Sequence, residues 1–158
     1  MEVARRRGAA AGLDLIDEIE VDAVRDLAVG RTILEAGCGT GLVLSPLSSV
    51  AKEAYGFDLS IGMVEKARAR GLNVALGSVT QVPFKDNSFD FVCSFKVLAH
   101  VPDITVALAE LARVTRPGGT VAAGGDTSSG DAASHASMTA EEMAAGHEQG
   151  VKDFLAGE

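Results

Sequence analysis

The fold of this chain is decided by the stretch Ile33-Leu34-Glu35-Ala36-Gly37-Cys38-Gly39-Thr40-Gly41. A short apolar run ends in a carboxylate, and three glycines then alternate with small residues before an apolar run resumes. This pattern predicts a buried strand, a tight turn and the start of a helix. Because glycine carries no side chain, the backbone of such a turn can lie close against a ligand.

Strand and helix patterns alternate on both sides of this turn. The predicted strands are residues 31–36, 53–57, 73–76, 90–95 and 120–123. The predicted helices are residues 10–28, 41–50, 60–70 and 103–115. The alternation predicts an α/β fold with an open, mainly parallel sheet flanked by helices. We expect this sheet to be Rossmann-like and doubly wound, with five strands in the order 3-2-1-4-5 that is typical of such folds.

The length of 158 residues and the hydrophobic fraction of 47% fit a single folded domain. We predict a disordered tail over residues 1–9, a ligand-binding domain with its N-terminal helix over 10–124, and a polar loop with a C-terminal helix over 125–158. No convincing pair of strands follows residue 124. The fifth strand is therefore predicted to be an exposed edge, through which a homodimer could form.

The composition limits the kinds of binding partner and the cellular compartment that we expect for this chain. The net charge of −8 disfavours nucleic acids and anionic lipid surfaces. No apolar run reaches the roughly 18 residues that a membrane span needs. The two cysteines, Cys38 and Cys93, have neither a metal-binding nor a disulfide spacing. We therefore expect a cytoplasmic protein with no metal site, no membrane and no nucleic-acid partner.

A carboxylate follows the second predicted strand at Asp58. In a sheet of this kind, ligands bind beyond the carboxyl ends of the strands, where the glycine turn and Asp58 both lie. A carboxylate there can accept two hydrogen bonds from a ribose diol, which favours a nucleoside site. The alternative is that Asp58 caps the helix beside Ser60. The glycine pattern is G-x-G-x-G with Leu42 next, and it therefore fits the dinucleotide fingerprint G-x-G-x-x-G poorly.

Five motifs follow one another along the chain: Glu-Ala-Gly-Cys-Gly-Thr-Gly at 35–41, Gly-Phe-Asp-Leu-Ser at 56–60, Val-Pro-Phe-Lys-Asp-Asn-Ser-Phe-Asp at 82–90, Ser-Phe-Lys-Val-Leu-Ala-His at 94–100 and Leu-Ala-Arg-Val-Thr-Arg-Pro-Gly-Gly at 111–119. In this order they resemble the class I S-adenosylmethionine-dependent methyltransferases, most closely the small-molecule, ubiquinone-biosynthesis-like subgroup. The resemblance covers about residues 31–124. It implies S-adenosylmethionine as cofactor and S-adenosylhomocysteine as product. The family's C-terminal antiparallel strand pair is missing from the predicted elements.

The resemblance also implies which residues bind the cofactor. Those implied for its methionine and sulfonium part are Glu35, Gly37, Cys38, Gly39 and Phe95, and Gly41 of the same turn is also implied to bind the cofactor. Those implied for its adenosine part are Asp58, Leu59, Met63, Ser78 and Val79. Among them Glu35 anchors the turn, Asp58 holds the ribose, and Ser78 stands where the family usually has aspartate. A neutral hydroxyl accepts a hydrogen bond from the adenine amine more weakly than a carboxylate does.

His100 is the candidate catalytic residue, since it follows the fourth predicted strand at the cofactor edge. A general base would serve an acceptor hydroxyl there, although the alternative is a loop histidine that satisfies backbone groups. Methyl transfer from a sulfonium depends mainly on alignment, so a base is not required. No activating base accompanies Cys38, which argues against a nucleophilic cysteine.

Three functions remain open at this point. The first is methyl transfer from S-adenosylmethionine to an unidentified small molecule. The second is a non-catalytic or truncated S-adenosylmethionine-binding module that acts through protein partners. The third is a fragment of an NAD(P)-binding oxidoreductase.

Overall fold

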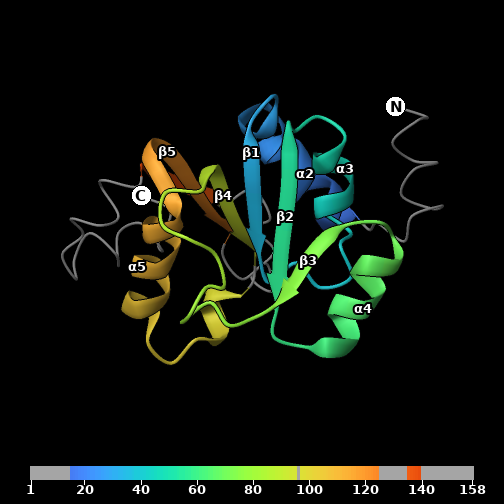
Figure 1. The fold of residues 1–158 in the computed structure, drawn as a ribbon. Coiled ribbons are helices and arrows are strands. Elements are labelled where there is room, and N and C mark those ends of the chain that lie inside the picture. Colours follow the sequence, from blue (N-terminus) through green and yellow to red (C-terminus); the bar gives the residue numbers. More distant parts are fainter. Residues whose placement is uncertain (1–14, 96, 125–134, 140–158) are drawn as a thin grey trace.

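The structure is a computed structural model and describes residues 15–95, 97–124 and 135–139. The elements in chain order are α2 (Leu15–Ala28), β1 (Thr32–Ala36), α3 (Leu44–Ser48), β2 (Glu53–Asp58), α4 (Ile61–Ala69), β3 (Asn73–Leu76), β4 (Phe89–Phe95), the 3-10 turn η1 (Leu98–His100), α5 (Ile104–Val114), β5 (Thr115–Gly124) and β6 (His135–Thr139). They build one central sheet with helices on both faces (Figure 1).

The sheet has the strand order β3-β2-β1-β4-β5-β6. Strands β1 to β5 pair in parallel throughout. The predicted five-stranded parallel sheet in the order 3-2-1-4-5 is therefore confirmed. The chain winds outward to β2 and β3 on one side of β1 and to β4 and β5 on the other. The carboxyl ends of β1, β2 and β4 consequently meet where the winding reverses, which is where such sheets bind ligands.

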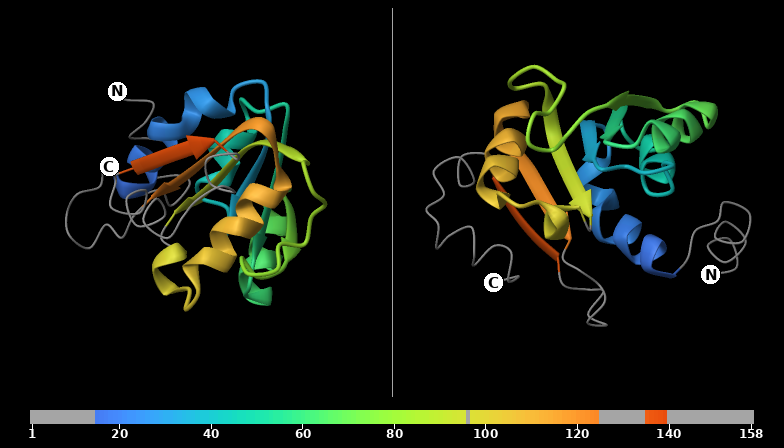
Figure 2. Two further views of the ribbon diagram at one scale, coloured as in Figure 1. Left: turned by 90° about the vertical axis from the view of Figure 1, so that its left-hand side faces the viewer. Right: turned by 90° about the horizontal axis from the view of Figure 1, so that it is seen from below.

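Strand β6 differs from the predicted polar loop. It pairs antiparallel with β5, in a register from Thr120 opposite Thr139 to Gly124 opposite His135, and Figure 2 shows it beside β5 in red-orange. The outer edge of β5 is thus hydrogen-bonded within the chain over this register. The reason for expecting a homodimer through that edge, unpaired backbone groups, does not hold there. The predicted N-terminal tail and C-terminal helix lie outside the described residues.

The two faces of the sheet carry separate hydrophobic cores. Strand residues alternate between the faces, so Ile33 packs with α2, α3 and α4, whereas Leu34 packs with α5. Both side chains are fully buried. Burial of each contributes about 1.5–3 kcal/mol relative to exposure. A shift of β1 by one residue would exchange the two faces, and the cores therefore fix the register that presents the glycine turn.

Two elements differ from the predicted bounds for local reasons. Helix α3 is shorter than the predicted helix over 41–50, and Pro46 lies in its first turn, where proline is tolerated. Strand β5 begins directly after α5 and includes the Arg-Pro-Gly-Gly break, with a register shift against β4 between Phe89 and Phe91. A bulge of this kind absorbs the extra residues without ending the pairing.

Candidate cofactor site

The glycine turn is held against the end of β2 by its own backbone. The N–H groups of Gly37 and Cys38 both donate to the carbonyl oxygen of Phe57, at 2.9 and 3.0 Å. Gly37 and Gly39 have φ values of +71° and +57°, which favour glycine. A Cβ on Gly37 would collide with Val97, whereas a Cβ on Gly39 would meet no atom within 4 Å. The turn is therefore closed at Gly37 and open to a ligand at Gly39.

Asp58 joins this turn to the start of α4. Its Oδ1 accepts a hydrogen bond from the Gly39 N–H at 3.1 Å, and its Oδ2 accepts one from the Ser60 N–H at 3.0 Å. Ser60 itself is the N-cap of α4, because its hydroxyl accepts from the Met63 N–H at 3.4 Å. The helix cap is thus Ser60 and not Asp58. A carboxylate has about four acceptor positions, so Asp58 keeps capacity for a ligand.

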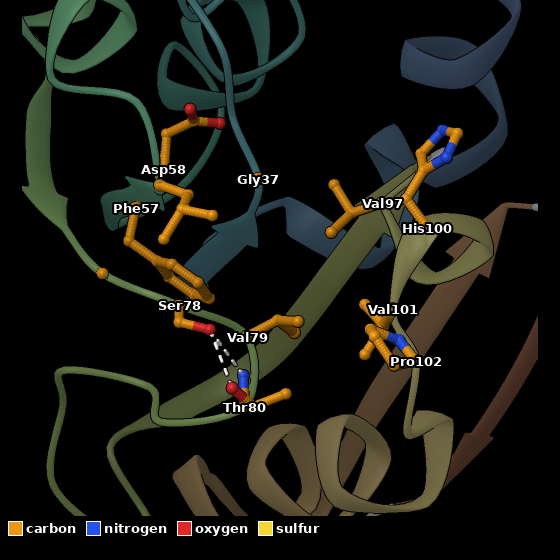
Figure 3. A pocket seen from close by; sticks show the side chains of 12 residues that line it. Gly37, Phe57, Asp58, Ser78, Val79, Thr80, Val97, His100, Val101 and Pro102 are labelled. Atoms are coloured by element: carbon orange, nitrogen blue, oxygen red, sulfur yellow. Dashed lines mark hydrogen bonds between the residues drawn. The ribbon is translucent and has the colours of Figure 1, made fainter.

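A cavity of about 270 Å³ lies beside Asp58, at the carboxyl ends of β2 and β4 (Figure 3). Five of the predicted cofactor residues line it, namely Gly37, Asp58, Leu59, Ser78 and Val79. We call this space the adenosine-side cavity, after the part of the cofactor that the resemblance implies for Asp58, Leu59, Ser78 and Val79. Its lining is mostly apolar, with Phe57, Val97 and Val101 among the residues that the sequence did not single out.

The polar wall of the adenosine-side cavity is the turn at Ser78. The Ser78 hydroxyl hydrogen-bonds with the Thr80 hydroxyl at 2.8 Å and accepts from the Thr80 N–H at 3.2 Å (Figure 3). One of its lone pairs is therefore committed to the turn. Opposite this wall lies His100, an exposed residue of η1 that also lines the cavity, across from Asp58 (Figure 3).

A second cavity of about 160 Å³ lies on the other side of Gly37. Its lining includes the predicted residues Glu35, Gly37, Cys38, Gly39 and Phe95. We call it the acidic cavity, because Glu20 of α2 also lines it. The exposed fractions of Glu20 and Glu35 are 2% and 3%. Two buried carboxylates at one small cavity favour a positively charged group there.

Glu20 is the functional candidate that the sequence reasoning missed. The sequence contains a pattern that indicates this residue. The spacing of four and three residues places Glu20 on the same helical face as Val24 and Leu27. Val24 and Leu27 both belong to the core packed between α2 and the sheet. A carboxylate at an apolar position of an amphipathic helix is therefore worth attention as a site residue.

The thiols of both cysteines have raised pKa values. Burial, together with the nearby carboxylates Glu35 and Asp58, raises the pKa of the Cys38 thiol to about 12. Burial also raises the pKa of the Cys93 thiol well above its ordinary value, with Glu35 and Glu20 adding to the effect. Both thiols stay protonated at neutral pH. Cys38 is thus no thiolate nucleophile, as its sequence context predicts.

Two predicted cofactor residues do not line either cavity. Gly41 turns its Cα towards Leu72, with which a Cβ would collide, and so serves the packing of α4 against the turn. Met63 lies in the first turn of α4, where its N–H binds the Ser60 cap. Within residues 15–95, 97–124 and 135–139, no cluster of three His, Cys, Asp or Glu side chains is arranged to hold a metal ion. None of the helices in that part has the length and apolar character needed to cross a membrane.

Comparison with known proteins relates the chain to methyltransferases. A family model described as a methyltransferase domain matches residues 34–123. A malonyl-[acyl-carrier protein] O-methyltransferase of Serratia marcescens is 41% identical over 110 residues, which are 65% of this chain and 43% of that protein. A demethylmenaquinone methyltransferase of Geobacillus kaustophilus is 42% identical over 100 residues, which are 57% of this chain and 43% of that protein. The chain spans less than half the length of these curated relatives.

Solved structures agree with these relatives. A Thermotoga maritima protein described as a SAM-dependent methyltransferase, possibly a histamine N-methyltransferase, superposes with a TM-score of 0.62 at 31% identity, covering 77% of this chain and 56% of that one. The matched residues 34–123 include the glycine turn, Asp58 and the Ser78 turn, but not Glu20.

Proposed function

Because the chain belongs to the methyltransferase domain family, we propose that it binds S-adenosylmethionine and transfers the methyl group to a small molecule, releasing S-adenosylhomocysteine. One observation carries this proposal: an apolar cavity with a carboxylate at its rim and an acidic cavity meet at the same glycine. The cofactor has the matching halves, an aromatic base with a ribose diol and a cationic methionine end.

The adenosine-side cavity suits the nucleoside half. An adenine ring gains from apolar contacts, which Phe57, Val79 and Val97 offer. The ribose hydroxyls would donate to the remaining acceptor positions of Asp58. The Ser78 hydroxyl would meet the edge of the base, and Leu59, which is 76% exposed, would cover its open face.

The acidic cavity suits the methionine half. Its carboxylates, Glu20 and Glu35, would pair with the ammonium group and lie near the sulfonium. Gly39 leaves room for the part of the cofactor between its ribose and its ammonium group. A side chain at Gly39 would occupy this open space and not the protein core. The fit is therefore one of charge and of shape.

The chemistry rests on positioning. When bound, the cofactor supplies an electrophilic methyl group on a sulfur that leaves as a neutral thioether. The task of the protein is to hold the acceptor in line with that bond and to exclude water. Phe95, at the end of β4, faces the acidic cavity beside Gly37, where the sulfur would lie. For a hydroxyl acceptor, His100 would take the proton from the oxygen as the bond to carbon forms.

The proposal also covers the bounds of the cofactor-binding domain, the cellular compartment and the class of methyl acceptor. We place the cofactor-binding domain within residues 10–124, with the methyl acceptor entering near η1. The two cysteines, both buried and without a disulfide, suit a reducing cytoplasm. The acidic net charge favours a small-molecule acceptor over a nucleic acid.

Isothermal titration with S-adenosylmethionine, S-adenosylhomocysteine and NADH tests this proposal. We expect the first two to bind in the micromolar range and NADH not to bind. Binding of NADH alone would refute it and favour a dinucleotide-binding fragment. Tight binding of both adenosyl compounds, with no methyl transfer to any member of a broad acceptor panel, would favour a binding module without activity.

A further inference from the structure

The wall of the adenosine-side cavity belongs to a long connection with little regular structure. Residues 77–88 link β3 to β4, and Gly77, Ser78, Val79 and Thr80 are the part that faces the cavity. Locally, the Gly77 N–H donates to the Asp58 carbonyl at 2.9 Å, and the Gln81 N–H donates to the Ser78 carbonyl at 3.0 Å. The first bond ties Gly77 to the end of β2 and the second closes one turn, but neither supports the middle of the connection from Val82 to Asp86.

An arginine and a glutamate of α5 supply that support. Arg113 donates from its two terminal nitrogens to the carbonyl oxygens of Val82 and Phe84, each at 2.9 Å. Glu110 accepts the Val82 N–H at 2.9 Å through Oε1. Three main-chain groups of the connection are therefore bound by two side chains of one helix.

These two side chains also hold each other in position. The Arg113 Nε donates to the Glu110 Oε2 at 2.7 Å, and an Arg113 terminal nitrogen also binds Asp86 of the connection at 2.7 Å. The side chains of Arg113 and Glu110 are only 32% and 21% exposed. The hydrogen bonds with Arg113 lower the pKa of Glu110 below its ordinary value, and those with Glu110 and Asp86 raise that of Arg113. The pair thus stays ionised, and its hydrogen bonds are charge-assisted.

The residues that Arg113 and Glu110 bind are packed against the turn that forms the cavity wall. Val79 and Val82 are both buried in the core under α5, with 7% and 3% exposure. Pro83 packs against Gly77 so closely that a Cβ there would lie 2.6 Å from the proline ring. A displacement at Val82 must therefore move the turn that faces the ligand.

We propose that Arg113 and Glu110 are positioning residues, which act through the connection 77–88 to set the shape of the adenosine-side wall. Neither side chain lines the cavity. The consequence for cofactor affinity rests on the proposed function, whereas the effect on the wall itself does not. The planar guanidinium fork is required, because one lysine ammonium cannot reach two carbonyls and two carboxylates together.

A matched control lies at the other end of the sheet. Arg116 binds Asp90 at 2.7 Å, with exposed fractions of 45% and 37%. This pair joins the beginning of β4 to the beginning of β5, away from both cavities. Arg116→Lys therefore removes a guanidinium from a carboxylate without removing one of the hydrogen bonds that hold the connection.

The test compares Arg113→Lys, Glu110→Gln and Arg116→Lys in two measurements below their melting temperatures. Hydrogen–deuterium exchange of the ligand-free protein reports the amides of Gly77, Thr80 and Gln81. Titration with S-adenosylhomocysteine reports the Kd. For Arg113→Lys we expect about tenfold faster exchange at these amides and a Kd raised about fivefold, with Arg116→Lys unchanged in both. For Glu110→Gln, whose amide oxygen still accepts from Val82, we expect a smaller change in the same direction.

The outcomes separate the two proposals. Unchanged exchange in Arg113→Lys, or the same change in Arg116→Lys, overturns the positioning role. Faster exchange with a Kd within twofold of the control also overturns it for cofactor binding. Faster exchange in a protein whose unmodified form does not bind S-adenosylhomocysteine supports the effect on the wall and refutes the proposed function.

Discussion

Removing the carboxylate of Asp58 is the most direct way to test the site. In the structure each of its oxygens accepts one backbone hydrogen bond, from Gly39 and from Ser60. In the complex it would also accept two from the ribose. A hydrogen bond to a charged group contributes about 1.5–3 kcal/mol. Part of the loss in Asp58→Ala is recovered by water, so we take one such bond as the net cost and expect the Kd for S-adenosylhomocysteine to rise at least about tenfold.

The substitution also affects stability, which the assay must keep apart from binding. Asp58→Ala removes the acceptor of the Gly39 and Ser60 N–H groups; because the exposed Ser60 N–H can bind water instead, we expect a cost of about 1 kcal/mol. Asp58→Asn retains one acceptor oxygen and the shape of the side chain. We therefore expect the asparagine variant to fold with a higher melting temperature than the alanine variant and still to bind weakly. Titration is carried out at a temperature where circular dichroism shows each variant folded.

A control on the same strand excludes a general effect of charge. Glu53 begins β2 as Asp58 ends it, so Glu53→Ala removes one negative charge at the far end of the strand. We expect its Kd to stay within about twofold of the unmodified protein. If Asp58→Ala binds as tightly as Glu53→Ala while both are folded, the ribose does not lie at Asp58 and the site is misplaced.

Three further predictions follow from the same geometry. Gly37→Ala should abolish cofactor binding and lower the melting temperature more than Gly30→Ala, because both have positive φ but only Gly37 faces Val97; equal shifts in a thermal scan would refute the collision. Glu20→Gln should weaken S-adenosylmethionine at least about threefold more than S-adenosylhomocysteine, since only the former carries a sulfonium; titration showing equal losses would remove Glu20 from the charge balance of the acidic cavity. The lowered pKa of Glu110 stabilises the fold above the unfolded value near 4.5, and this contribution is lost as pH falls through the folded pKa. The stability deficit of Glu110→Gln in urea should therefore shrink between pH 7 and about pH 3, and a constant deficit would contradict it.

The sequence predicted the parts of this molecule that short-range patterns determine. The glycine turn and the carboxylate after β2 each follow from a few adjacent residues. The strand order followed from the alternation of elements together with the resemblance. These are features in which local preference and the final fold agree.

The missed features depend on contacts between distant residues. The strand β6 has no strong alternation of its own and gains its structure from main-chain pairing with β5. Glu20 reaches the acidic cavity only because α2 packs beside the end of β1. The state of the Ser78 hydroxyl depends on Thr80, two residues away, in a turn whose geometry no propensity specifies. Gly41 lies within the matching glycine motif, but its Cα faces Leu72. Met63 is a residue of α4 that lines neither cavity.

Gly37, which has no side chain, lines both the adenosine-side cavity and the acidic cavity. If the proposed function holds, a nucleoside in the adenosine-side cavity would leave the acidic cavity accessible to a free amino acid. A linker that passes Gly37 and joins two such fragments would make the binding of the second fragment intramolecular. The effective concentration of that fragment would rise accordingly. Because Gly37 has no side chain, ligands that link a group in the adenosine-side cavity to a group in the acidic cavity suit this site.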